Sequence, residues 1–169
     1  MNYFFIDAET DGLYGKFISV AVLVTDECGR ELESFYGAVD VSPEEISSDW
    51  VKENVLPHLG NAKSVYKTEY DLLEAVWTFW MKYRETSFAV SDVMHPVESR
   101  FFTECVRHNL KEREFLSPFP LLDLSTLLIS RDIHWDADRQ ELSGLELISH
   151  DAMNDVKLTA AIWHKYIKE

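Results

Sequence analysis

The spacing of hydrophobic residues changes near residue 40. Before that point, residues 2–8, 16–26 and 31–41 form three runs rich in β-branched and aromatic residues. The sequence Asp-Glu-Cys-Gly at 26–29 is a turn signal between the last two runs. Consecutive strands with short connections favour antiparallel pairing. The first part of the chain is therefore predicted to be a three-stranded antiparallel meander.

After residue 41 the apolar positions follow a helical period. Long helices are predicted over 69–84, 97–113 and 150–168, where apolar residues recur every three or four positions. Shorter helices are expected from Ser42, over 47–59 and over 125–130, short strands at 87–91 and 121–124, and a polar surface loop at 134–144. The predicted fold is α/β, with a mixed five-stranded sheet flanked by helices in a single domain over residues 1–169.

Composition limits the function classes. The chain has 16 basic and 30 acidic residues and a net charge of −14, which argues against a protein that coats nucleic acid by neutralising many phosphates. An enzyme that reaches phosphates through metal ions is still allowed, because the metal supplies the positive charge. The two cysteines lack metal-site spacing, and no apolar run approaches the roughly 18 residues of a membrane span. We expect a soluble, cytoplasmic protein that does not enter membranes.

Candidate chemistry begins at the end of the first predicted strand. Asp7 and Glu9 are two positions apart, so their carboxylates would lie on the same face of that strand. Like charges this close repel each other unless a cation lies between them, and hard oxygen ligands suit Mg²⁺ or Mn²⁺. A solvated strand end explains the same two residues equally well.

A second candidate lies at the start of the last predicted helix. His150 and Asp155 are five positions apart there, with Ser149 or His150 expected near the helix cap. Asp155 falls on the apolar face of this helix, beside Ala152 and Val156. A carboxylate that faces inward requires a partner, whereas a lone histidine is more often structural than catalytic.

Three motifs in this order resemble the DEDDh 3′–5′ exonucleases, a family with the ribonuclease H-like fold that includes ribonuclease T, oligoribonuclease and polymerase proofreading exonucleases. The residues FIDAETDGLYGKFISVAVLV resemble its first two strands, PLLDLSTLL its short strand carrying Asp, and HDAMNDVKLTAAIW its closing helix. The resemblance covers nearly the whole chain. It implies a ribonuclease H-like fold and a metal-dependent exonuclease.

The middle motif departs from the family pattern. The family has an Asp followed by apolar residues, whereas this chain has SDVMHPVESRFF. Glu98, with two phenylalanines behind it, fits the position of that Asp best, and Asp92 at the strand end is the alternative or an assisting group behind the ligands. A glutamate reaches one methylene further, so it would hold its metal differently.

The resemblance implies a two-metal mechanism and two Mg²⁺ or Mn²⁺ ions per site. Asp7 would bridge both ions, Glu9 and Asp155 would complete one site, and Glu98 would hold the other. His150 would accept the proton of the attacking water, a role that imidazole suits at neutral pH. The product would be a nucleoside 5′-monophosphate.

The resemblance also implies a set of substrate contacts. Thr10, Gly12 and Leu13 would meet the terminal base, with Leu13 as an apolar wedge. One of Phe101 and Phe102 would stack on the substrate while the other supports the core, or else both are buried. Asp123 is expected to act behind the ligands or structurally. The bases Arg100, Arg107, Lys111 and Arg113 could follow phosphates or form a solvated helix face.

The implied substrate is a single-stranded RNA or DNA 3′ end, with RNA favoured by resemblance to the compact single-domain members. Such members are often homodimers, and Trp50, Trp135 and Tyr36 are expected to supply exposed aromatic surface for a dimer. The rival interpretations are a ribonuclease H-like binding or scaffold domain without catalysis, and a metal-dependent enzyme of another substrate class such as a nucleotide phosphatase.

Overall fold

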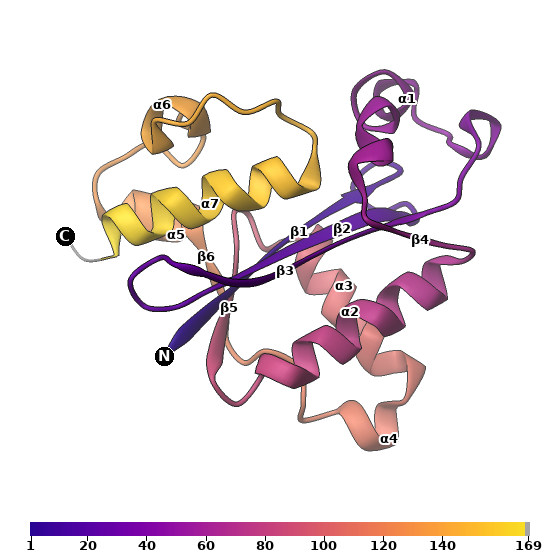
Figure 1. Cartoon of the computed structure of the whole chain (residues 1–169), viewed down its shortest axis with the longest axis horizontal. Coiled ribbons are helices and arrows are strands. Elements are labelled where there is room, and N and C mark those ends of the chain that lie inside the picture. Colours follow the sequence, from indigo (N-terminus) through magenta and orange to yellow (C-terminus); the bar gives the residue numbers. More distant parts are fainter. Residues whose placement is uncertain (168–169) are drawn as a thin grey trace.

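A mixed sheet forms the centre of the computed structural model, which describes residues 1–167 (Figure 1). Within these residues the sheet has six strands in the order β4-β3-β2-β1-β5-β6. The strands are β1 (Asn2–Thr10), β2 (Phe17–Thr25), β3 (Glu31–Val39), β4 (Ser64–Tyr66), β5 (Ser87–Ser91) and β6 (Leu121–Asp123). The predicted antiparallel meander is confirmed as β1, β2 and β3, while β4, β5 and β6 join by parallel pairing.

Helices cover both faces of this sheet. The α-helices are α1 (Asp49–Asn54), α2 (Glu69–Tyr83), α3 (Val97–His108), α4 (Leu110–Arg113), α5 (Leu124–Ser130), α6 (Arg139–Ser143) and α7 (Ala152–Tyr166). Two 3₁₀ turns, η1 (Pro43–Glu45) and η2 (Leu56–Asn61), flank α1. Helices α2 and α3 lie on one side of the sheet, and α5 and α7 lie on the other (Figure 1). No helix within residues 1–167 is long and apolar enough to cross a membrane.

The central strand β1 distributes its side chains between these two layers. Phe4 and Ile6 belong to the core under α2 and α3, whereas Phe5 belongs to the core under α5 and α7. Successive side chains of a strand point to opposite faces, so Asp7 and Glu9 continue the row of Phe5 on the α7 side. The strand is thus apolar on both faces until its acidic end.

Several predicted boundaries were wrong. The sheet has a sixth strand because β4, three residues long and mostly exposed, adds to the edge at β3. The helix predicted over 97–113 ends at His108, because Asn109 has φ −152° and ψ 68° and separates α3 from α4. The predicted loop at 134–144 contains α6. The last helix begins at Ala152, and the predicted end at Lys168 lies outside the described residues.

The exposed aromatic surface is also smaller than predicted. Trp50 and Trp135 are about half exposed, but Tyr36 is only 4% exposed and packs beneath α7. Tyr36 therefore belongs to the core and cannot contribute to a dimer surface.

Candidate functional site

The acidic end of β1 is held under the start of α7. Phe5, on the same face as Asp7 and Glu9, packs in one cluster with Val156 and Ala160 of α7. This packing fixes the height of the helix above the strand, and the first turn of α7 then lies over the two carboxylates. Glu9, His150 and Asp155 each offer one ligand atom within 4.8 Å of the others.

The turn before α7 positions His150 and Asp155. The helix cap is Asp151, which accepts hydrogen bonds from the backbone N–H groups of Met153 (3.0 Å) and Asn154 (3.3 Å). The cap is thus the residue directly after His150, which was expected near the cap. His150 has a left-handed backbone (φ 63°), and its N–H donates to Asp155 Oδ2 at 2.9 Å. This conformation is unusual for a residue with a Cβ, so the site holds His150 in a defined orientation.

A tryptophan from helix α1 contacts this histidine. The Trp50 ring, on α1, meets the His150 ring edge-on with 4.8 Å between centroids. The segment around α1 is tied down, because Asp11 accepts hydrogen bonds from the N–H groups of Ser47 and Ser48. At its other end Asn61 donates to Asp151 at 2.6 Å.

Glu98 approaches Asp7 from the opposite side of the sheet end. It lies in the first turn of α3, is 5% exposed, and accepts a hydrogen bond from the Ala8 N–H at 3.2 Å. Because β1 also carries Asp7 and Glu9, this hydrogen bond brings the Glu98 carboxylate close to theirs. The cleft that these groups line has a volume of about 720 Å³, and Leu13, Asp92, His150 and Asp155 also face it.

Burial and mutual repulsion raise the pKa values of these acids. The pKa of Asp7 is raised well above its ordinary value by burial, then by Glu9 and Glu98. Burial raises the pKa of Glu98 to about 8 and those of Glu9 and Asp155 to about 7. Acids that are this reluctant to ionise together are typical of sites completed by a cation.

The donor set fits divalent cations. The arginine that lines the cleft, Arg139, is already bound to Asp92. The cleft is lined by seven acidic residues: Asp7, Glu9, Asp92, Glu98, Asp136, Asp138 and Asp155. Hard carboxylate oxygens suit Mg²⁺ or Mn²⁺.

Asp92 is held by an ion pair that the sequence did not reveal. Arg139 Nε lies 2.9 Å from Asp92 Oδ2, and Arg139 Nη2 lies 2.8 Å from Oδ1. Arg139 also donates to the backbone oxygens of Trp135 and Ala137, so it joins the 135–139 segment to the end of β5. The only available sequence signal was Asp138-x-x-Glu141, a helix-start pattern, and Asp138 does cap α6.

Asp123 stabilises the segments that follow β5 and β6. Its side chain caps α5 by accepting from the Thr126 N–H at 2.7 Å, and it also accepts from the Met94 N–H at 2.8 Å. These hydrogen bonds hold the segment after β5, which leads to Glu98. Asp123 does not line the cleft.

The predicted substrate contacts divide into two groups. Leu13 is 62% exposed and lines the cleft, and Gly12 has φ +73°, a conformation that glycine adopts without strain. Thr10 donates to the Gly12 oxygen at 2.7 Å and so shapes this turn. Phe101 and Phe102, at 0% and 3% exposure, belong to the core and have no face available for a base.

The basic residues around α3 are largely engaged within the protein. Arg100 donates to the Gly15 oxygen, Arg107 pairs with Glu104, and Arg113 pairs with Glu74. These contacts tie the three guanidinium groups to oxygen acceptors within the protein.

Fold and site together define a class: a ribonuclease H-like α/β domain with a cleft, lined by acidic residues and a histidine, at the end of its central strand. Solved structures that resemble the chain carry exonuclease descriptions. A zinc-bound complex of E. coli exonuclease I with single-stranded DNA matches with a TM-score of 0.70 and 16% identity, over 99% of this chain and 40% of that one. Exonuclease I of Methylocaldum szegediense matches with a TM-score of 0.65 and 16% identity, over 96% of this chain and 39% of that one.

A structure described as a full-length 3′-exonuclease matches with a TM-score of 0.66 and 14% identity, over 99% of this chain and 81% of that one. At such low identity these likenesses show the fold. The chain spans about two fifths of the length of the exonuclease I chains. No family model and no curated protein matches the sequence.

Proposed function

We propose that the chain is a metal-dependent 3′–5′ exonuclease that hydrolyses single-stranded nucleic-acid ends, with RNA favoured. The observation that carries this proposal is the meeting of Asp7, Glu9, Glu98 and Asp155 around one cleft. Three of these carboxylates come from sequence positions that the DEDDh resemblance assigns to metal binding, and Glu98 takes the fourth position.

The ligand roles are those that the DEDDh resemblance implies. Asp7 would bridge two Mg²⁺ or Mn²⁺ ions, Glu9 and Asp155 would complete one ion's site, and Glu98 would hold the other. We prefer Glu98 to Asp92 because Glu98 is bonded to β1, whereas both oxygens of Asp92 are engaged by Arg139. When bound, such ions supply the positive charge that activates water and stabilises the departing 3′-oxygen.

The residues of the chain would orient the reaction around that charge. His150 would accept the proton of the water that attacks the terminal phosphodiester, while the bond from phosphorus to the 3′-oxygen breaks. A nucleoside 5′-monophosphate leaves, and the shortened strand keeps a 3′-hydroxyl. Leu13, exposed on its turn, would press against the terminal base, and Thr10 with Gly12 would hold that turn in place.

The choice of RNA rests on resemblance to compact single-domain exonucleases. Three of the structural neighbours are instead complexes with single-stranded DNA or a DNA oligonucleotide. Matched 5′-labelled RNA and DNA oligonucleotides decide between them. We expect faster shortening of RNA by the same protein sample, and faster shortening of DNA would overturn the preference without affecting the exonuclease proposal.

One assay tests the activity itself. The labelled oligonucleotides are incubated with Mg²⁺, Mn²⁺ or EDTA, and the products are separated by length. We expect a ladder that shortens from the 3′ end with either metal and is absent with EDTA, and that is lost in Asp7→Ala. Glu98→Ala should lose more activity than Asp92→Ala. No shortening with either metal, while Asp7→Ala binds RNA as the wild type does, would instead indicate a binding domain.

A further inference from the structure

A second cavity adjoins the cleft, across the turn that carries Leu13. It has a volume of about 470 Å³ and is lined by residues from the turn, the start of α2 and the outer face of α3. Leu13 faces the cleft, and the next three residues, Tyr14, Gly15 and Lys16, face this second cavity. The two spaces are therefore separated by one turn of chain.

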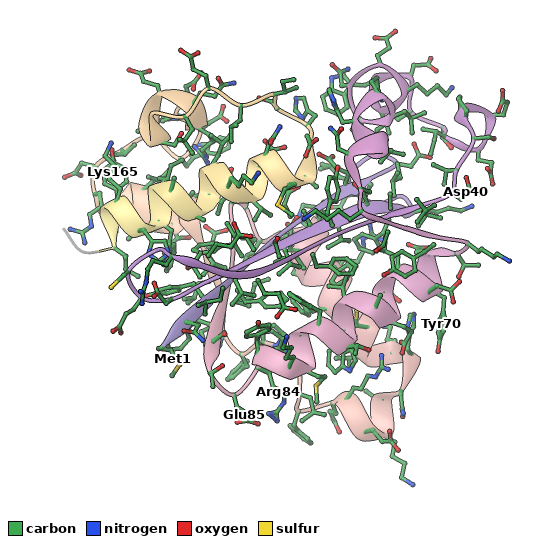
Figure 2. All side chains as sticks on the ribbon, in the orientation of Figure 1. Met1, Asp40, Tyr70, Arg84, Glu85 and Lys165 are labelled. Carbon is green, nitrogen blue, oxygen red and sulfur yellow. The ribbon has the colours of Figure 1, made fainter. Side chains whose placement is uncertain are left out.

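Aromatic rings form one part of this cavity. The Tyr70 ring stacks on the His108 ring with 4.3 Å between centroids and 26° between planes. Tyr70 is 55% exposed and Tyr14 is 73% exposed. Figure 2 shows Tyr70 at the edge of the molecule, near the start of α2. An exposed ring that is already supported on one face by another ring can stack on a nucleobase at little ordering cost.

The cationic side chains of Arg100 and Lys16 line another part of the cavity. The Arg100 guanidinium is held 4.1 Å above the Phe17 ring and donates from Nη2 to the Gly15 oxygen. Its Nε is buried and has no hydrogen-bond partner among the described residues. Lys16 adds a flexible ammonium group to the same space.

The acids of the cavity are already engaged. Glu69 accepts a hydrogen bond from the Phe17 N–H at 2.8 Å, and Glu104 is paired with Arg107. Their negative charges are thus partly compensated within the protein, while the charges of Lys16 and Arg100 face the cavity. Rings for stacking beside cations for phosphate are the combination that binds unpaired nucleic acid.

We propose that this cavity binds a nucleotide upstream of the 3′ end that occupies the cleft. Its base would stack on Tyr70 or Tyr14, and Lys16 would contact the phosphate next to it, with Arg100 contributing a fixed positive charge. The inference rests on the proposed function, because it assumes that a single strand enters the cleft by its 3′ end. It goes beyond that function in assigning a specificity for substrate length.

Length dependence provides the test. Hydrolysis is measured on single-stranded oligonucleotides of two, four and six residues, in the wild type, Tyr70→Ala and Lys16→Ala. In the wild type KM should fall at least about tenfold from two to four residues, as one stacked base is expected to contribute. Tyr70→Ala and Lys16→Ala should raise KM for four residues by about tenfold and leave both kcat and the cleavage of two residues unchanged.

Two further variants control for general effects. Tyr70→Phe keeps the ring and should behave as the wild type. Phe115→Ala removes another exposed aromatic side chain, 88% exposed and outside this cavity, and should change nothing. A wild-type length dependence in Tyr70→Ala, or a loss of kcat equal for all lengths, would overturn the proposed site.

Binding distinguishes failure of this site from failure of the proposed function. The affinity of labelled oligonucleotides is measured by fluorescence anisotropy in EDTA, where no hydrolysis is expected. If no variant cleaves but Tyr70→Ala weakens binding of four residues relative to two, the exonuclease proposal fails and the nucleotide site stands. If the wild type cleaves and neither binding nor KM depends on length, the site fails and the exonuclease proposal stands.

Discussion

The buried carboxylate of Glu98 allows a quantitative prediction for Glu98→Gln. Burial raises the pKa of Glu98 from an ordinary 4.5 to about 8, so ionisation costs folding free energy. The folded state holds the proton more tightly than the unfolded state. Stability is therefore unaffected below pH 4.5, falls as pH rises, and bears the full cost above about pH 8. Glutamine has the same shape, carries no charge, and retains an oxygen for the Ala8 N–H.

The expected magnitude follows from this shift. A rise from 4.5 to about 8 corresponds to about 5 kcal/mol for the ionised carboxylate. The hydrogen bond from the Ala8 N–H to the carboxylate already contributes to that pKa, so the full shift carries over to the stability difference. In EDTA, Glu98→Gln should therefore be about 5 kcal/mol more stable than the wild type at pH 9. The two proteins should be nearly equal at pH 4.

Urea unfolding in EDTA at pH 4, 7 and 9 measures this difference. Glu104→Gln is the matched control, because it changes a surface acid of the same helix, and its stability should stay within about 0.5 kcal/mol of the wild type. Added Mg²⁺ should stabilise the wild type at pH 8 much more than Glu98→Gln. A Glu98→Gln protein that is less stable at pH 9, or a difference that does not depend on pH, would refute the argument.

Three other variants probe the surroundings of the cleft. Arg139→Ala should lower the free energy of unfolding by about 1–3 kcal/mol in urea titrations, because Asp92 loses a two-point ion pair. Asp151→Ala should cost about 1–3 kcal/mol in the same titrations, because it removes the cap of α7 together with other hydrogen bonds. Trp50→Ala should lower kcat about tenfold, roughly the 1.4 kcal/mol of one aromatic contact, because His150 loses its edge-on support.

Each of these variants has a control. Arg107→Ala breaks an exposed pair and should cost under about 0.5 kcal/mol, and a similar cost for Arg139→Ala would contradict the role given to that pair. Asp138→Ala removes the cap of the short surface helix α6 and should cost only about 0.5–1 kcal/mol. Trp50→Phe keeps an aromatic edge and should restore most of kcat, and an unchanged rate in Trp50→Ala would exclude a positioning role.

The sequence predicted the parts of the site that depend on local periodicity. The period of two in β1 placed Asp7 and Glu9 on one face, and the period of 3.6 in α7 turned Asp155 inward. Both predictions needed only backbone geometry and the position of the neighbouring apolar residues. The resemblance to the DEDDh exonucleases added Glu98, and the structure places it against β1.

The remaining parts depend on contacts between distant segments, which periodicity does not encode. Arg139 lies in a polar stretch, and its importance comes from Asp92, 47 positions earlier. The contact of Trp50 with His150 joins segments 100 positions apart. The sequence alone left open whether Phe101 stacks on a ligand or is buried. Its packing against Phe17 on β2 shows that it belongs to the core.

The docking of α7 on β1 also has a consequence for synthesis of the protein. The cleft joins residue 7 to residue 155, so a chain emerging from the ribosome has Asp7 and Glu9 long before it has the helix that faces them. The sheet of the first strands can form early, because its hairpins are local. Before α7 has been synthesised, the nascent chain lacks the Asp155 carboxylate of the cleft. The cleft can therefore assemble only after residue 155 has been synthesised.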